Sequence, residues 1–253
     1  YVDMPVNWCE ELGTVLSNDE VIDGKSERGG YPVVRKNMKQ LCIDQPAFAE
    51  RLLEGLNNID WPESTKEMQR NWIGKSTGVE VEFNIVGGGK FSIFTTCIET
   101  IYGITFMVLA PDGKLVQDLM PRIQNKEEVK AYIQQTLSKS DMDRTELNKG
   151  KTGCRLEGIK AINPVNGREV EVFIGDFVLA NYGTGAVMAV PSHDQRDFEY
   201  AKAHNIDMIQ VIEGRDVSEC AFEKQDYLGK GCKLINSEEF TGLTVEEAKV
   251  AII

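Results

Sequence analysis

The chain has 253 residues, 42% of them hydrophobic and 27% charged, which is ordinary for a globular protein of one large or two small domains. Its 40 acidic and 28 basic side chains give a net charge of −12, which opposes broad contact with a nucleic-acid backbone but allows a small contact with a strand end. No apolar segment is long enough to span a bilayer, and the opening residues do not resemble a signal peptide. We therefore expect a cytoplasmic protein with no membrane partner. Because the chain begins with Tyr1 and not Met, we expect it to be part of a longer protein.

The cysteines are scattered without a CxxC pair, which favours reduced thiols over a disulfide scaffold. Only His193 and His204 could join them in a zinc site, and neither lies near a cysteine pair, so a zinc site is disfavoured. The six cysteines are Cys9, Cys42, Cys97, Cys154, Cys220 and Cys232.

The first third of the chain is predicted to be mostly helical. Residues 44–59 carry apolar side chains at helical spacing, namely Phe48, Leu52, Leu53 and Leu56. Residues 64–74 predict a second helix, with Ser64 and Glu67 forming a capping box.

The middle of the chain is predicted to be rich in strands. Residues 79–85 alternate apolar and polar side chains, a GGG turn follows, and KFSIFTT is the second arm of a hairpin. ITFMVLAPDG predicts a buried strand, and two further strands flank the turn NPVNG. The remaining predictions are a helix over 125–140 with Val129, Ile133 and Leu137 on one face, a strand over 208–212, and a closing helix capped by Thr244 and Glu247. These elements favour a mixed α+β fold around a strongly bent sheet over a doubly wound parallel sheet.

Residues 181–204, NYGTGAVMAVPSHDQRDFEYAKAH, admit several interpretations. A phosphate loop is disfavoured because GTG lacks the length and the Lys of a P-loop, and Met188 replaces the third glycine of a dinucleotide-binding pattern. A metal site is disfavoured because His193 and Asp194 are adjacent and would point in different directions on a helix. A capping box of Ser192 and Gln195, with Asp197 in the first turn, explains part of the pattern. Helix cap and functional site both remain open at this point.

A second segment, FTTCIETIYG over 94–103, places Thr95, Thr96 and Thr100 at a predicted strand end. Threonine is common in strands for packing reasons alone. However, hydroxyls facing a carboxylate-bearing helix start would suit a ligand with an amine and an ester. A Ser/His/Asp triad is disfavoured because the chain lacks a G-x-S-x-G motif and has only two histidines. A Cys97 nucleophile is disfavoured because no histidine lies near it in the sequence.

Four segments, together with the chain's end, resemble the editing insertion of bacterial leucyl-tRNA synthetases. The segments are VNWCEELGTVLSNDEVIDG (6–24), EMQRNWIGKS (67–76), FTTCIETIYG (94–103), YGTGAVMAVPSHDQRDFEYA (182–201) and FTGLTVEEAKVAII (240–253). The resemblance covers essentially the whole chain and implies a barrel-like sheet core with surrounding helices. It divides the chain into a flanking or hinge part, 1–76, and an editing core with its closing helix, 77–253. HIGH and KMSKS are absent, so aminoacylation is not expected.

The resemblance implies hydrolysis of the ester between a wrong amino acid, such as isoleucine, valine or a norvaline-like residue, and the 3′ end of tRNA(Leu). Asp197 would hold the α-ammonium group, and Thr95 and Thr96 would contact the substrate and the attacking water. Thr100 would exclude leucine by its bulk. Asp194 and His193 would support substrate binding, and the pocket would be lined by Tyr182, Met188 and Val190. The resemblance implies a monomeric domain attached to the synthetase body, and no metal or cofactor.

The sequence also departs from the family. The TTRPDT motif reads TTCIET here, so that Cys97, Ile98 and Glu99 replace Arg, Pro and Asp. The segment DGKSERGG lacks the zinc cysteines of some members, and MKQLCIDQPAFAERLL lacks the usual Trp. Three other interpretations stay open: an isoleucyl- or valyl-type editing domain, a non-catalytic module that binds aminoacyl-adenosine, and a metal-dependent hydrolase.

Overall fold

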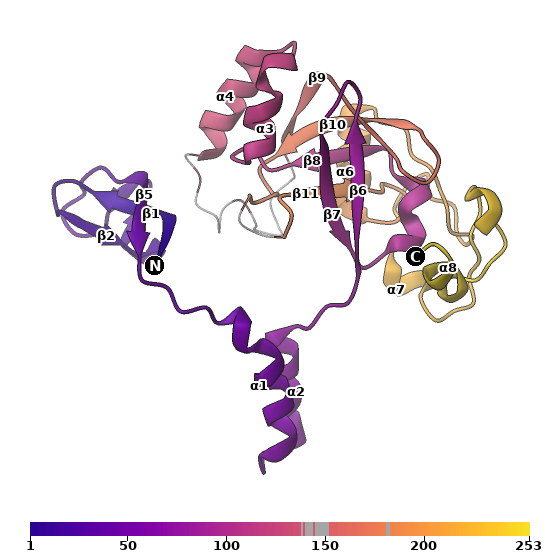
Figure 1. Cartoon of the computed structure of the whole chain (residues 1–253), viewed down its shortest axis with the longest axis horizontal. Helices are drawn as coiled ribbons and strands as arrows, with labels where there is room; N and C mark the ends of the chain where they lie inside the picture. The colour runs from indigo at the N-terminus through magenta and orange to yellow at the C-terminus, as the bar shows by residue number, and fades with distance from the viewer. Residues whose placement is uncertain (138, 140–143, 145–151, 181–182) are drawn as a thin grey trace. The chain divides into compact units, whose positions relative to one another are not determined.

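The computed structural model describes residues 1–137, 139, 144, 152–180 and 183–253. These residues form two compact units, Tyr1–Ser76 and Thr77–Ile253, called here the N-terminal unit and the C-terminal unit (Figure 1). No helix in the described ranges is both long and apolar enough to cross a membrane.

The N-terminal unit begins with a small antiparallel sheet. Its strands are β1 (Val2–Cys9), β2 (Thr14–Leu16) and β5 (Val34–Gln40) in the order β2-β1-β5, beside a two-stranded ribbon of β3 (Val21–Ile22) and β4 (Lys25–Ser26). The prediction of a mostly helical N-terminal part was wrong here. Val34–Gln40 has no alternation of apolar and polar residues, and it is held as a strand by continuous backbone pairing with β1. Periodicity cannot detect a strand of this kind.

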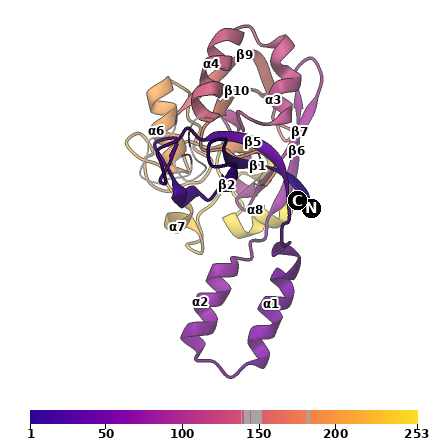
Figure 2. The ribbon, with the colours of Figure 1, turned by 90° about the vertical axis from the view of Figure 1, so that its left-hand side faces the viewer.

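Two helices complete the N-terminal unit, α1 (Ala49–Gly55) and α2 (Glu63–Ile73), which lie side by side (Figure 2). The helix predicted over 44–59 is present as α1, with the 3-10 turns η2 (Pro46–Phe48) and η3 (Leu56–Asn58) at its two ends. Of its four apolar residues only Leu56 is buried, while Phe48 is 50% exposed and Leu52 is 56% exposed.

The start of α2 corrects a second prediction. Pro62 is the N-cap residue and no side chain caps the helix, so the capping box of Ser64 and Glu67 is wrong. Ser64 already lies inside the first turn, two residues too late to cap it. Glu67 instead accepts a hydrogen bond from Arg70 at 3.1 Å.

The C-terminal unit is built on a six-stranded mixed sheet in the order β11-β8-β10-β9-β6-β7. The strands are β6 (Val79–Ile85), β7 (Lys90–Thr95), β8 (Phe106–Leu109), β9 (Gly153–Ile162), β10 (Glu169–Gly175) and β11 (Ala186–Ala189). Only β8 and β10 are paired in parallel; the other neighbours are antiparallel. The predicted hairpin of β6 and β7, the buried strand β8 and the hairpin of β9 and β10 are all confirmed.

The sheet is strongly curved. Its end strands, β7 and β11, are last and first in the hydrogen-bonded order, yet they lie against one another. No ladder of hydrogen bonds joins them in the described part of the chain, so a closed barrel is not seen. The mixed α+β class is confirmed, and the curvature brings the end of β7 to the same side of the unit as β11.

Helices cover the sheet and enclose the core. They are α3 (Lys114–Leu119), α4 (Lys126–Leu137), α6 (Gln195–His204), α7 (Lys224–Tyr227) and α8 (Val245–Ala251). Ile93, Met107, Leu156 and Ile174 are completely buried among them. Across the hairpin turn, Gly87, Gly88 and Gly89 have φ values of 81°, 105° and 100°, a backbone conformation that favours glycine.

Three further predictions for this unit have different outcomes. The closing helix is confirmed as α8, because Thr244 Oγ1 accepts from the Glu247 amide at 3.3 Å. In α4, Val129 is buried as predicted but Leu137 is 48% exposed, and Thr136 is buried in its place. The strand predicted over 208–212 is wrong: only Ile212 forms a bridge, to Leu234.

Candidate functional site

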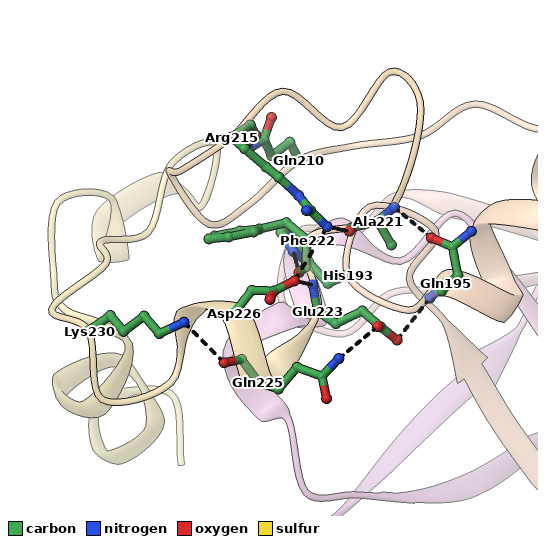
Figure 3. A network of polar contacts seen from close by, with 10 residues as sticks. All are labelled: His193, Gln195, Gln210, Arg215, Ala221, Phe222, Glu223, Gln225, Asp226 and Lys230. Carbon is green, nitrogen blue, oxygen red and sulfur yellow. Dashed lines mark hydrogen bonds and ion pairs between the residues drawn. The ribbon is translucent and has the colours of Figure 1, made fainter.

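Helix α6 is capped by Asp194. Its Oδ1 accepts from the amides of Arg196 at 2.9 Å and Asp197 at 3.0 Å. The predicted capping box of Ser192 and Gln195 is therefore wrong, since the helix starts two residues later than that pattern requires. Gln195 Oε1 instead accepts from the Ala221 amide at 3.0 Å (Figure 3). Asp194 is thus bound to the backbone of the helix whose start it fixes.

Asp197 lies in the first turn of α6 and is 9% exposed. Its Oδ2 accepts from the Val190 amide at 3.0 Å, which ties the carboxylate to the residue that follows β11. The helix N-terminus favours negative charge at this position. The result is a buried carboxylate in a fixed orientation at the start of α6.

The ring of His193 is bonded through both nitrogens. Nδ1 donates to the Phe222 carbonyl at 2.9 Å, and Nε2 accepts from the amides of Val211 at 3.0 Å and Ile212 at 3.2 Å. Burial lowers the pKa of His193 to about 4, so the ring is neutral at pH 7. These bonds also explain why the segment around Val211 does not form the predicted strand: its amides point at the ring. The ring of His193 thus holds the backbone of residues 211, 212 and 222 in place near the start of α6, and Figure 3 shows His193 with neighbouring residues.

The three predicted threonines lie in one tight turn, residues 95–103, called here the threonine turn. It runs from the end of β7 through the 3-10 helix η4 (Ile98–Gly103). Thr95 Oγ1 accepts from the Cys97 amide at 3.0 Å, and Thr100 Oγ1 donates to the Cys97 carbonyl at 2.9 Å. Thr95 and Thr100 are buried, whereas Thr96 is exposed.

The threonine turn packs on the residues that hold Asp197. A Cβ atom added to Gly103 would lie 3.0 Å from Val190 Cγ1 and 3.1 Å from Val211 Cγ2, so the two segments approach as closely as a glycine allows. Asn163 Nδ2 also donates to the Ile101 carbonyl at 2.9 Å, fixing the turn to the β9–β10 hairpin. The structure therefore connects the hydroxyl turn to the carboxylate helix through Gly103 and Val190.

The pocket-lining residues predicted around β11 are placed in part. Met188 is half-buried in β11, and Val190 is buried directly after it. Tyr182 lies outside the described residues. Within the described ranges, no group of three or more His, Cys, Asp or Glu side chains is arranged to hold a metal ion.

Roles for Glu99, within the threonine turn, and for Tyr227 and Lys224 of α7 were not predicted from the sequence. Glu99 is completely buried, and its Oε1 accepts from Tyr227 Oη at 3.2 Å and lies 3.5 Å from Lys249 Nζ. Burial, and then the charge of Glu99, raise the pKa of Tyr227, so it stays protonated and donates. Lys224 Nζ, three residues before Tyr227, donates to Thr96 Oγ1 at 3.4 Å. No sequence pattern signals these contacts, because the partners lie 128 residues apart.

Comparisons with known proteins agree with this fold. The family described as leucyl-tRNA synthetase, editing domain, matches residues 70–253. A crystal structure of a ternary complex of Agrobacterium radiobacter K84 agnB2 LeuRS with tRNA and LeuAMS is similar over 87% of this chain, with 31% sequence identity and a TM-score of 0.64. The present chain spans 27% of that protein.

A curved α+β unit with a buried carboxylate beside a hydroxyl-rich turn, matched in this way, is an editing domain of the aminoacyl-tRNA synthetase class. More narrowly, the chain belongs to the family of leucyl-tRNA synthetase editing domains.

Proposed function

We propose that the chain carries out post-transfer editing, the hydrolysis of the ester that joins a non-cognate amino acid to the 3′ end of tRNA(Leu). The observation that carries the proposal is the buried carboxylate of Asp197, oriented by the Val190 amide beside the threonine turn. The substrate offers one permanent cation, its α-ammonium group, which an oriented and desolvated carboxylate binds strongly. Isoleucine, valine and norvaline-like residues are the proposed amino acids.

In this mechanism Asp197 binds the α-ammonium group and so fixes the ester carbonyl relative to the turn. Thr95 Oγ1 already accepts from the Cys97 amide, so its own hydrogen remains to donate to a substrate or water oxygen. A water molecule attacks the carbonyl carbon, the bond to the ribose oxygen breaks, and that oxygen receives a proton. Positioning and electrostatics supply the rate enhancement, with no covalent intermediate on the protein.

Selection against leucine is assigned to Thr100. It is 2% exposed and its hydroxyl is fixed to the Cys97 carbonyl, so it cannot turn aside for a larger side chain. Met188 and Val190 line the same pocket in this proposal. A rigid wall is useful here because an apolar pocket separates side chains differing by one methylene by only about 10- to 200-fold.

The experiment is deacylation of Ile-tRNA(Leu) by Asp197→Asn. Asparagine keeps an oxygen that can accept from the Val190 amide but loses the charge, so the fold should persist while kcat/KM falls by about 100-fold. Asp207→Asn, which neutralises an exposed carboxylate just beyond α6, is the matched control and should leave the rate unchanged. An Asp197→Asn variant that deacylates at the wild-type rate would refute the role of the charge.

The same assay separates the other interpretations. Bound ligand without turnover in the wild type would make the chain a binding module, and full-length enzyme run in parallel shows whether the rest of the synthetase is needed. Loss of activity in excess chelator would indicate a metal-dependent hydrolase. Thr100→Ala should begin to cleave Leu-tRNA(Leu), and continued sparing of leucine would refute the steric role of Thr100.

A further inference from the structure

Helix α7 is a single turn with one face on the threonine turn. Residues three apart lie on the same side of a helix, and Lys224 and Tyr227 are so spaced. Tyr227 Oη donates to Glu99 at 3.2 Å, and Lys224 Nζ donates to Thr96 at 3.4 Å. Because Tyr227 and Glu99 are fully buried, this contact anchors α7 and sets where the Lys224 ammonium group lies.

The other face of α7 is fixed to the segment before it. Asp226 forms an ion pair with Arg215 at 3.3 Å, and Gln225 Nε2 donates to Glu223 at 3.2 Å (Figure 3). Glu223 Oε1 also accepts from the Gln195 amide at 3.4 Å, which connects α7 to the start of α6. These contacts prevent α7 from turning Lys224 away from the threonines.

Lys224 differs in its ion pairing from other lysines of the C-terminal unit. Within the described residues no carboxylate lies at ion-pair distance from its ammonium group, whereas Lys139, Lys160 and Lys249 each pair with one. In the threonine turn, Oε1 of Glu99 accepts from Tyr227 and lies 3.5 Å from Lys249 Nζ. An unpaired and partly exposed cation on the proposed substrate threonine is notable in a chain of net charge −12.

We propose that Lys224 binds the phosphate group adjoining the terminal ribose of the mischarged tRNA. The inference rests on the proposed function, which places the ester at the threonine turn. The ribose that carries the ester also carries a phosphodiester on its 5′ oxygen, so an anion necessarily lies on the same nucleotide as the reacting bond. Lys224 supplies a localised cation for that anion without making the domain basic as a whole.

Two non-hydrolysable probes test the proposal by binding alone: an isoleucyl-adenosine amide analogue with a 5′-phosphate and the same analogue without it. Lys224→Ala should weaken binding of the phosphorylated probe by about 5- to 10-fold and leave the other unchanged. Added salt should weaken binding of the phosphorylated probe to the wild type by screening, and Lys224→Ala should reduce that salt dependence. Lys224→Arg should restore most of the affinity.

Lys230→Ala is the matched control, because its ammonium group donates to the Gln225 carbonyl at 3.2 Å (Figure 3) and forms no hydrogen bond or ion pair with the threonine turn among the described residues. It should leave both affinities unchanged. Equal weakening of both probes by Lys224→Ala would show that the residue only positions Thr96, and no weakening of either would also overturn the proposal. Binding of the probes without deacylation of Ile-tRNA(Leu) by the wild type would refute the proposed function and leave the role of Lys224 to be decided by the probes.

Discussion

The two units bury their apolar side chains to very different extents. Most large apolar side chains that are well exposed belong to the N-terminal unit, among them Trp72 at 87%, Ile43 at 81% and Leu41 at 74%. The C-terminal unit buries a continuous core between its curved sheet and its helices. The family match at 70–253 takes in the whole C-terminal unit and only the last residues of the other. The unit with the candidate site therefore has its own core, while the N-terminal unit depends more on backbone pairing.

The largest expected effect compares one substitution in the two units. Leu156→Ala removes a completely buried side chain from the C-terminal core and should lower the free energy of unfolding by about 2–5 kcal/mol. Leu52→Ala, at a side chain 56% exposed in α1, should lower it by less than about 0.5 kcal/mol. Urea unfolding followed by circular dichroism measures both. Similar losses at the two positions would mean that the N-terminal unit is packed as tightly as the other.

A second prediction concerns pH, because both histidines lie in the C-terminal unit. Burial lowers the pKa of His193 to about 4 from 6.5, so the unfolded chain binds a proton at pH values where the native ring does not. The stability from the neutral ring is complete above pH 6.5 and is lost as the pH falls to 4, by about 3 kcal/mol. Between pH 6.5 and 4, the unfolding free energy of His193→Gln should therefore fall by about 3 kcal/mol less than that of the wild type.

His204→Gln changes an exposed ring and serves as the control, with the pH dependence of the wild type expected. If the unfolding free energies of the two variants fall by the same amount between pH 6.5 and 4, the buried ring of His193 does not govern the acid sensitivity.

The smallest expected effect compares two helix starts. Asp194→Ala removes the acceptor of two amides at the start of α6 and should cost about 1 kcal/mol of unfolding free energy. Ser64→Ala lies at the start of α2, where no side chain caps the helix, and should change stability by less than about 0.5 kcal/mol. Thermal unfolding measures the stability of both variants. A larger loss of unfolding free energy for Ser64→Ala would support the capping box predicted from the sequence.

These two starts also show what sequence patterns could predict. A polar residue followed three positions later by Glu or Gln correctly indicated the cap at Thr244 but not those at Ser64 or Ser192. The pattern is local, whereas competing partners are not: Gln195 is bound to the Ala221 amide, 26 residues away. The sequence predicts a strand where apolar and polar residues alternate. Val79–Ile85 shows this alternation and was predicted, whereas Val34–Gln40 lacks it and was missed.

The candidate site was predictable only in its local parts. The threonines and Asp197 stand in two short segments that are visible in the sequence, and the assignment of a role to each still depends on family resemblance. The contacts that join them were not predictable. These contacts join residues far apart in the sequence, and no local pattern marks the residues that make them. They are Gly103 with Val190, Asn163 with Ile101, and Tyr227 with Glu99.

The direct pairing of β8 with β11 has a consequence for how the site is acquired during folding. The threonine turn leads into β8 and β11 leads to the start of α6, so pairing of β8 with β11 brings the turn and the helix start together, and these strands lie far apart in the sequence. Contacts of such large sequence separation form slowly, because the chain must lose loop entropy before it gains them. Binding competence should therefore return in the slowest phase of refolding, after most secondary structure has formed.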